Sequence, residues 1–581
     1  MSRLSFGIAV LLASGGVFAA TPEWVARSDA YTQPVLKDTG KYQPEESTEL
    51  GDESFDTGVA DFKPRDYERQ LADTEKRLQA LRRERAAEKD VKVRQDLDIL
   101  IDSREKLIAS MKLERQYLLN YVNVGELVYG GLRALLDTRN KPARQKLALV
   151  RLKRYAGTES GYTPMATLVR ARTEERLANK GLIGPYVGEV EEGLNNNATY
   201  MNGIEELLKK DGLSGWEADF AALKAQVKAY DEWVRSRILP RARKEVRLPE
   251  PVYVNRLVNV GVDITPGQMI ERASFDFQEV RDQMQVVAGT IAAQRKLLSP
   301  DYRDVMRELK KTSIPADQLL PYYRERLKDI EGIIRAHNLV TLPARDASIR
   351  TASSAEAARS PAPFMSPPRL IGNTGEYGEF VIPLSNPNAK SKDKMNDFDF
   401  SAMAWTLTAH EARPGHELQF ASMVEQGMSV ARARYAFNST NVEGWGLYSE
   451  AMILPYMPPE GQLVSLQARL LRMARALIDP QINLGRMTPE QGKQFLMQEV
   501  VLSEPFAQSE VDRYSYRMPG QATAYYYGYV KLRALKTLAE IELGERFRLK
   551  AFNDFVIAQG ILPPQLMREA VLNEFIPSQK K

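Results

Sequence analysis

"YERQLADTEKRLQALRRERAAEKDVKVRQDLDILIDSREKLIASMKLERQYLLN", residues 67–120, is the stretch whose pattern decides the fold class. Among dense charges, apolar residues recur at a spacing that suits one face of a helix: Leu71, Leu78, Leu81, Leu97, Leu100 and Ile101. The pattern predicts two long amphipathic helices that break near Lys89–Val93. Such helices could offer a coiled-coil surface to a partner, but packing against the rest of this chain is the simpler expectation.

The same helical patterning continues from residue 121 to 338 and resumes after residue 400. Proline-bearing breaks interrupt it, and no repeat of fixed period is present. One stretch, "TGEYGEFVIPL" (374–384), combines β-branched and aromatic residues between turn formers and predicts a strand. We therefore expect a mainly α protein: a large multi-helix body with a deep cleft and a small β element near 374–384.

With 581 residues, the chain is too long for one ordinary core. Residues 20–65 are polar and turn-rich, which predicts a poorly structured arm. A helical N-terminal region over 66–350 follows. The stretch 351–368 is rich in Ala, Ser and Pro and predicts a linker or surface loop. Residues 369–581 then form the expected catalytic region.

The first twenty residues have the pattern of an export signal. Arg3 gives a short basic start, an apolar stretch follows, and Val17-Phe18-Ala19 suits cleavage after small residues. The apolar stretch is shorter than a membrane-spanning helix requires, and no later segment predicts a span. The chain has no cysteine, hence no disulfide and no lipid-attachable thiol. We expect a signal peptide over 1–19 and a soluble periplasmic protein.

The charge balance argues against a nucleic-acid partner. The formal charge is +4, from 80 basic and 76 acidic side chains. Basic runs such as "LRRER" (81–85) are flanked by acidic residues and are typical of a solvated helix face. The sequence does not indicate an oligomeric state.

"HEARPGHELQ", residues 410–419, contains two of the three histidines in the chain. Zinc hydrolases bind their metal through three side chains, usually His, His and a carboxylate. Histidines four residues apart share a helix face, but His410 and His416 are six apart, about 240° around a regular helix. An undistorted helix therefore cannot bring both to one ion.

Pro414 and Gly415 supply the means of distortion. Pro414 removes a backbone donor and crowds the preceding turn, while Gly415 tolerates unusual backbone angles. A widened, π-like turn would return His416 to the face of His410 and leave Glu411 beside the metal as general base. The alternative is a helix that ends at Arg413, followed by a turn and an exposed histidine.

A third ligand is expected from "NVEGWGLYSEAM", residues 441–452. Glu443 and Glu450 lie two helical turns apart on nearly one face, so both cannot easily reach the same ion. We expect Glu443 to be the ligand and Glu450 to hold a ligand histidine. A solvent-facing position is the alternative for each glutamate.

The stretch "DRYSYRMPGQATAYYYGYVKLR", residues 512–533, is rich in hydrogen-bond donors. Tyr, Arg and Gln side chains can stabilise the oxyanion that forms when a peptide carbonyl is attacked. Tyr525 and Gln521 lie four apart on one helical face, and Arg513 is close in sequence. Most of the other tyrosines are expected to be structural.

Together with the tail "FNDFVIAQGILPPQLMREAV", these motifs resemble the bacterial domain of unknown function 885 family, which is grouped with gluzincin-like metallopeptidases. The family motif reads H-E-x-x-P-G-H-H-L-Q. The resemblance implies a zinc site at His410, His416 and Glu443, with Glu411 as base. The "E-G-W" helix also looks like the third-ligand helix of thimet-oligopeptidase-like enzymes, in which a tyrosine matching Tyr525 lines the cleft.

Two positions depart from the family pattern. Glu417 stands where the family usually has a second histidine, and Asn553 stands where it often has one. If the second histidine were the true ligand, a carboxylate would weaken the preference for zinc. If the tail histidine assists catalysis, its loss would impair activity.

The motifs predict a zinc-dependent hydrolase that cleaves short peptides with water activated by the metal and deprotonated by Glu411. Arg413, Arg513 and Arg517 are expected to bind a terminal carboxylate, and the strand Gly378–Pro383 to pair with the substrate backbone. Two rival hypotheses remain. One is a catalytically silent periplasmic relative that binds peptides or a partner. The other is an interaction protein whose functional part is the region 66–120.

Overall fold

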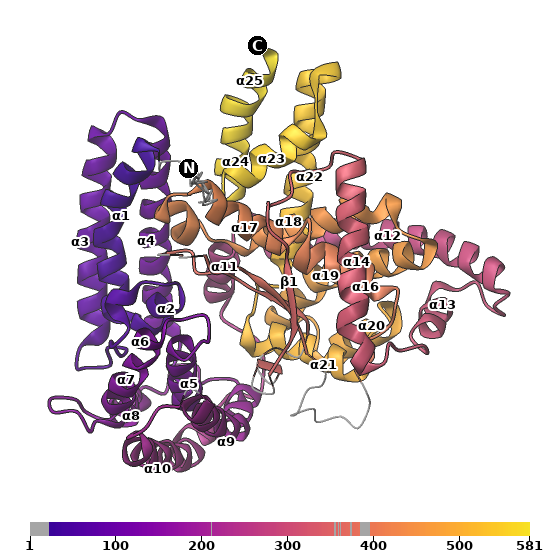
Figure 1. Ribbon diagram of the computed structural model, residues 1–581. Coiled ribbons are helices and arrows are strands. Elements are labelled where there is room, and N and C mark those ends of the chain that lie inside the picture. Colours follow the sequence, from indigo (N-terminus) through magenta and orange to yellow (C-terminus); the bar gives the residue numbers. More distant parts are fainter. Residues whose placement is uncertain are drawn as a thin grey trace, which may run out of the picture.

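The fold is mainly α, as the sequence predicts, and is shown by a computed structural model (Figure 1). The structure describes residues 22–210, 212–353, 356–357, 360, 362–371, 373, 375–383 and 395–581. The signal peptide expected over 1–19 lies outside these residues. Within them, no helix is both long and apolar enough to cross a membrane.

An N-terminal lobe, indigo to purple in Figure 1, extends to about residue 241 and has its own apolar core. Its helices are α1 (Glu23–Tyr42), α2 (Pro44–Glu49), η1 (Glu53–Phe55), α3 (Asp66–Ala87), α4 (Val91–Tyr117), α5 (Val124–Leu135), α6 (Pro142–Gln145), α7 (Leu147–Ala156), α8 (Met165–Leu177), α9 (Val187–Lys210), α10 (Glu217–Trp233), η2 (Val234–Ile238) and η3 (Leu239–Arg241).

The predicted break between two long amphipathic helices is confirmed. Helix α3 ends at Ala87, and Asp90 caps α4 by accepting from the amides of Lys92 and Val93. The apolar positions Leu81 and Leu97 are fully buried. Helix α4 packs on α1 and α3 and on two elements of the other lobe, α11 and η5, so it is part of the body of this chain.

The expectation of a poorly structured arm over 20–65 is wrong, because α1 and α2 together cover more than half of it. Several of the buried positions of α1 are Ser28, Thr32 and Gly40 rather than large apolar residues. Its helical period is therefore nearly invisible in a hydrophobicity pattern. Pro34 lies inside the helix, although proline and glycine, as at Pro34 and Gly40, usually predict the end of a helix.

The second lobe holds the remaining helices, which are α11 (Glu250–Asn259), α12 (Pro266–Arg295), α13 (Tyr302–Leu309), α14 (Ala316–Ala336), α16 (Met403–Leu407), η4 (Thr408–Ala412), α17 (His416–Gln426), η5 (Ala431–Tyr435), α18 (Ser439–Ile453), η6 (Leu454–Tyr456), α19 (Pro459–Asn483), α20 (Pro489–Glu499), α21 (Glu504–Asp512), η7 (Arg513–Arg517), α22 (Thr523–Leu543), η8 (Gly544–Arg546), α23 (Leu549–Ala558), α24 (Pro564–Ala570), η9 (Val571–Phe575) and α25 (Ile576–Lys580).

The domain boundary expected between residues 350 and 369 does not separate two cores. The largest apolar cluster joins residues of α11–α14, such as Met269 and Tyr302, to residues of α19–α22, such as Leu470 and Tyr526. Helices α12 and α19 lie against each other. Helical periodicity shows that each helix buries a face, but it does not show which helix covers that face.

A three-stranded sheet lies in the second lobe with the order β1-β3-β2. Strand β1 (Ser348–Thr351) runs parallel to β3 (Glu379–Ile382), and β2 (Phe364–Ser366) runs antiparallel to it. The predicted strand contains β3. Strands β1 and β2, which fall in the predicted helical region and linker, are short and were not expected.

The position of β3 corrects one expectation. Since β3 is the central strand, its two edges are already paired, and Gly378–Pro383 cannot add a substrate strand. Strand β2 lies at an edge of the sheet instead.

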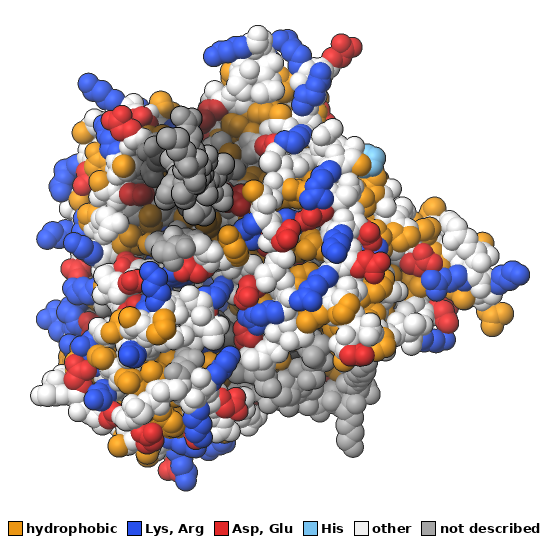
Figure 2. All heavy atoms as spheres, in the orientation of Figure 1, with side chains coloured by type: hydrophobic (Ala, Val, Ile, Leu, Met, Phe, Trp, Pro, Cys, Tyr) orange, Lys and Arg blue, Asp and Glu red, His pale blue; other side chains and the backbone are white. Residues whose placement is uncertain are grey.

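The surface carries charges of both signs. Figure 2 shows Lys and Arg side chains interspersed with Asp and Glu on the face drawn, without a broad basic area. This distribution agrees with the small net charge of the chain.

Candidate metal centre

The backbone distortion expected between the two histidines is present. Thr408–Ala412 forms a π-helical turn, a cis peptide joins Arg413 to Pro414, and α17 begins at His416. A Cβ on residue 415 would lie 1.8 Å from the carbonyl oxygen of His410, so only glycine fits there. The rings of His410 and His416 consequently approach to 4.6 Å between centroids.

Glu443 completes a convergent set of three side chains. Its Oε2 atom lies 3.4 Å from Nε2 of His410 and 3.4 Å from Nε2 of His416. Helix α18 carries Glu443, and the Nε1 atom of Trp445 on the same helix donates to the carbonyl oxygen of Pro414 at 2.9 Å. This bond fixes the helix that carries Glu443 relative to the turn between the histidines.

The three side chains fit a zinc ion. With Zn–N and Zn–O bonds near 2.1 Å, neighbouring ligand atoms of a tetrahedral site lie about 3.4 Å apart. Buried oxygens normally have a hydrogen-bond partner, yet the buried Oε2 atom of Glu443 has none within the described structure. A metal ligand is expected to lack one. The donor set of two imidazoles and one carboxylate is also common in catalytic zinc sites.

Glu450 lies where it was expected, behind His410. Its Oε1 atom is 2.7 Å from Nδ1 of His410, and its Oε2 atom accepts from the hydroxyl of Thr406 at 2.7 Å. Arg472 donates to Oε1 at 3.0 Å. Burial opposes ionisation, but Arg472 and His410 hold the pKa of Glu450 below its usual value. The carboxylate is placed to accept a hydrogen bond from Nδ1 of His410, which would leave the Nε2 atom available to a metal ion.

Glu411 faces the same point from the π-helical turn. A ligand atom of its carboxylate and ring nitrogens of both histidines lie within 4.8 Å of one another. Its side chain lines the cavity in front of the histidines, and burial raises its pKa. A carboxylate beside the two histidines and open to the cavity is suited to accept a proton from water.

Tyr525 and Arg513 lie together on the cavity wall, whereas Gln521 lies behind them. Nη2 of Arg513 donates to the hydroxyl of Tyr525 at 2.9 Å and also to Oε1 of Gln521. Gln521 is not among the described residues that line the cavity, which corrects its expected role as an oxyanion donor. It positions Arg513 instead.

Arg472 and Arg475, which the motifs did not indicate, also surround Tyr525. Their guanidinium carbons lie 5.8 and 4.5 Å from the centre of its ring, and both line the cavity. The sequence did contain a signal for them: arginines recur every three residues in the otherwise apolar run "LQARLLRMARAL" (466–477). Charged side chains are rarely buried unless they are paired or functional, so arginines on an apolar helix mark a candidate site.

Arg413 cannot bind a substrate carboxylate as expected. It is 1% exposed, and its guanidinium donates to Glu417 at 2.8 Å, Glu331 at 2.7 Å and the carbonyl oxygen of Arg345 at 2.6 Å. Arg517 does line the cavity, but it is paired with Glu192 of α9.

The two departures from the family motif have structural explanations. Glu417 is fully buried and pairs with Arg413 at 2.8 Å and Arg345 at 2.9 Å, so it is not placed as a metal ligand. Asn553 is also fully buried. It donates to the carbonyl oxygen of Leu339 at 2.8 Å and accepts from the hydroxyl of Tyr448 at 3.0 Å. Neither residue weakens the arrangement at His410 and His416.

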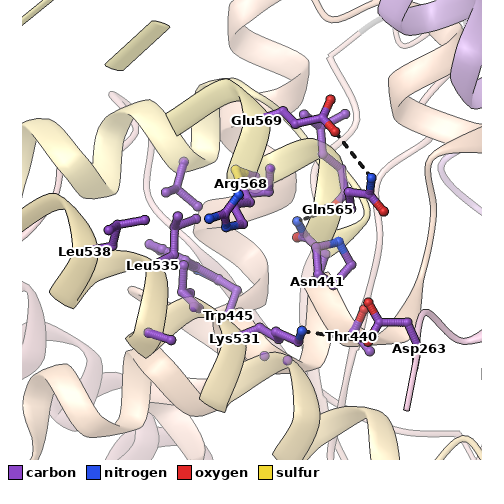
Figure 3. A pocket seen from close by; sticks show the side chains of 18 residues that line it. Asp263, Thr440, Asn441, Trp445, Lys531, Leu535, Leu538, Gln565, Arg568 and Glu569 are labelled. Atoms are coloured by element: carbon purple, nitrogen blue, oxygen red, sulfur yellow. Dashed lines mark hydrogen bonds and ion pairs between the residues drawn. The ribbon is translucent and has the colours of Figure 1, made fainter. Parts of the chain in front are cut away.

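The cavity in front of the histidines has a volume of about 510 Å³. A second cavity of about 540 Å³ lies behind α18 and α22, where Figure 3 shows Leu535 and Leu538 on one side and Asp263 and Asn441 on the other. Its described lining contains no histidine and no group of metal-binding side chains. Chemistry rather than size therefore marks the first cavity as the candidate site.

Comparisons with known proteins agree on the fold and family. Two solved structures cover 95% of this chain and 100% of their own chains. One is a candidate lipoprotein from Colwellia psychrerythraea, at 19% identity and a TM-score of 0.75. The other is a candidate lipoprotein of unknown function from Shewanella oneidensis, at 18% identity and a TM-score of 0.73. No protein with a curated functional description matches.

The family model for bacterial proteins of unknown function called DUF885 matches residues 44–571, which include most of both lobes and every residue of the candidate metal centre. The match begins inside the N-terminal lobe, so that lobe is part of the family's common structure. The chain therefore belongs to the DUF885 family.

Proposed function

We propose that this protein is a zinc-dependent peptidase that hydrolyses peptide bonds in short peptides. One observation carries the proposal: Nε2 of His410 and Nε2 of His416 both lie 3.4 Å from Oε2 of Glu443. Their separation matches the spacing of ligand atoms around a tetrahedral zinc ion. Zinc bound there would polarise the peptide carbonyl and lower the pKa of water toward neutrality.

The residues around the three ligands have distinct roles in this proposal. Glu411 accepts a proton from the attacking water and then delivers it to the leaving amine. Tyr525 stabilises the oxyanion. Because Arg513 donates to the hydroxyl oxygen of Tyr525 and cannot accept, the tyrosine proton remains available to the substrate. Glu450 keeps the ring of His410 oriented.

The edge strand β2 is suited to bind the substrate backbone. Phe364 and Met365 of β2 line the cavity that contains the histidines. An extended peptide could pair with the free edge of β2, which would leave its carbonyl groups near Glu411 and Tyr525. A cavity of about 510 Å³ favours short peptides over folded proteins.

Export to the periplasm is part of the proposal. The apolar N-terminal stretch supports an exported protein. The two structural neighbours are described as candidate lipoproteins, which agrees with export. Intact-mass measurement of protein recovered from the periplasm should give a chain that begins near Ala20.

The alternative is a catalytically silent relative; it was suggested by Glu417 and Asn553, and both residues have structural partners. The test of the peptidase is metal content, measured by plasma mass spectrometry on the wild type and on His416→Ala purified side by side. We expect about one zinc per chain in the wild type and far less in the variant. Wild-type protein that binds no zinc even after reconstitution would refute the proposal.

Turnover is tested with the zinc-loaded protein on a peptide library. Glu411→Gln should retain zinc and lose cleavage by roughly 10²–10⁴-fold, the usual contribution of a general base. A library left intact by the loaded wild type would favour the silent peptide-binding relative.

A further inference from the structure

A cavity of about 330 Å³ adjoins the one that contains the histidines. Phe420, Phe437 and Pro367 line both cavities, so the two spaces meet at these side chains. The N-terminal lobe supplies much of the outer wall, from α2, α5 and the residues that follow α5. A substrate that extends beyond the proposed metal centre therefore enters a space formed by both lobes.

One arginine in this cavity lacks a strong acidic partner. Arg434 is 8% exposed, and its Nη1 and Nη2 atoms are buried without a hydrogen bond among the described residues. The carboxylate paired with it, that of Glu46, is 3.7 Å away on a side chain that is 55% exposed. A buried charged donor without a hydrogen-bonded partner is unfavourable unless a ligand binds it.

The other four arginines of the cavity are paired more closely. The nearest ion pairs of three of them are Arg133–Glu49 at 2.8 Å, Arg139–Asp137 at 2.8 Å and Arg144–Asp56 at 2.6 Å, and Arg369 pairs directly with Glu376. Among the described residues of this wall, Arg434 is the arginine whose two terminal nitrogens both lack a hydrogen bond.

A second buried arginine adds to the positive charge. The guanidinium groups of Arg104 and Arg434 lie 5.2 and 5.6 Å from the centre of the Tyr435 ring. The hydrogen bonds of the Arg104 guanidinium go to the neutral hydroxyls of Ser103 and Thr39. Two buried cations with weak anionic compensation favour the entry of an anion.

Strand β2 connects the two cavities. Phe364 and Met365 line the space with the histidines, and Ser366 lines the space with Arg434. A peptide laid along this edge advances about 3.3 Å per residue. It would reach from the proposed metal centre into the arginine-lined cavity within about three residues.

We infer that the cavity containing Arg434 is an anion subsite that receives a carboxylate of the substrate, either an acidic side chain or the free C-terminus. The inference rests on the proposed peptidase function and adds its substrate class. The planar guanidinium group suits a carboxylate, which it can bind through two parallel hydrogen bonds. The preferred substrates are thus short peptides with a carboxylate at a fixed distance, about three residues or fewer, from the cleaved bond.

The experiment uses the zinc-loaded full chain and two octapeptide libraries that differ only in a C-terminal amide or free acid. Cleavage sites are read by mass spectrometry. Enrichment of Asp and Glu at one position in both libraries identifies an acidic side chain as the ligand. Cleavage at a fixed distance from the end in the free-acid library alone identifies the C-terminus. Either result supports the subsite.

Variants assign the preference to Arg434. Arg434→Gln should lower kcat/KM for the best acidic peptide about tenfold or more and leave its neutral counterpart unchanged. Glu46→Gln should raise kcat/KM for the acidic peptide, because it removes the competing carboxylate. Two effects of opposite sign exclude simple unfolding. Arg533→Gln, on the exposed part of α22 and outside both cavities, is the matched control and should change neither value.

Cleavage without any preference for a carboxylate, or a preference retained in Arg434→Gln, would overturn the inference and leave the peptidase intact. If neither library is cleaved, the proposed function fails and the subsite is tested by binding. Fluorescence polarisation would then compare labelled alanine octapeptides with one central Glu or Gln. Binding about tenfold tighter for Glu, lost in Arg434→Gln, supports the subsite; equal binding refutes it.

Discussion

Gly446→Ala tests the metal centre through a residue that touches no ligand atom of the metal. A Cβ on residue 446 would lie 2.5 Å from Cε1 and 2.8 Å from both ring nitrogens of His410. His410 is 2% exposed and its Nδ1 atom lies 2.7 Å from Oε1 of Glu450, so the ring cannot rotate away freely. Ordinary contact at 3.4 Å would require the ring to retreat by about 0.9 Å.

That displacement is large compared with the tolerance of a metal site. Zinc–ligand distances hold to about 0.2 Å. Disturbing the partner of a ligand costs 10–100-fold in affinity, so displacing the ligand itself should weaken zinc binding by about 100-fold or more. The fold is affected less, because alanine gains up to about 1 kcal/mol over glycine in a helix and offsets part of the clash.

Competition with a zinc chelator measures the zinc affinity. Thermal unfolding with and without zinc measures how much the bound ion stabilises the fold. Zinc that stabilises the wild type by about 4 kcal/mol, at a thousand times its Kd, should stabilise a 100-fold weaker variant by only about 1.4 kcal/mol. Gly289→Ala in α12 is the control, because a Cβ there meets nothing within 4 Å. Wild-type zinc affinity in Gly446→Ala would refute the assignment of His410 as a ligand.

Three further predictions concern the surroundings of the site. Tyr525→Phe should lower kcat by roughly 10²–10³-fold with little change in zinc content, since it removes only the oxyanion donor; steady-state kinetics on the best library peptide measures this. Asp96→Ala should cost about 3–5 kcal/mol in urea unfolding, because Asp96 is 1% exposed and pairs with the buried Arg432 at 2.8 Å. Wild-type stability would show that the pair contributes little. Burial opposes the ionisation of Glu510, but Arg475 holds its pKa at about 2. Because the folded pKa is below the unfolded one near 4.5, the carboxylate adds about 3 kcal/mol above pH 4.5, and this is lost as the pH falls toward 2. Urea curves should therefore show Glu510→Gln far less stable than the wild type at pH 7 and nearly equal at pH 2; a gap that does not shrink would contradict the assigned pKa.

The central turn was predictable because local chemistry dictates it. Histidines six residues apart can share a face only through a widened turn, and Pro414 with Gly415 leaves few other conformations. The π-helical turn at Thr408–Ala412 meets that requirement. The spacing of Glu443 and Glu450 on one helix likewise limits them to one ligand and one supporting residue, and the distances to His410 agree.

Features that depend on tertiary packing were not predictable in the same way. Helix α1 buries Ser28 and Thr32, and their polarity hides the helical period in the sequence. Such burial is possible where other parts of the fold contribute hydrogen-bond partners. The hydroxyl of Ser28, for example, donates to Asp96 at 2.6 Å. The weakly compensated charge of Arg434 is invisible in "ARARY", where Arg432 two residues earlier is tightly paired.

The packing of α3 and α4 bears on the rival hypothesis that residues 66–120 are the functional part. Helix α4 carries Asp96, which pairs with Arg432 and accepts from Ser429 in the segment that leads to Arg434. Deleting the hairpin would therefore disturb the proposed anion subsite as well as any partner surface. A loss of function after that deletion would not separate the two hypotheses. Substitutions on the exposed face of α3, such as Arg82→Glu with its partner change Glu105→Arg, preserve the packing and test the surface alone. If these charge reversals leave peptide cleavage and its acidic preference unchanged, the exposed face of the hairpin takes no part in cleavage, and the hairpin contributes to cleavage only by supporting η5.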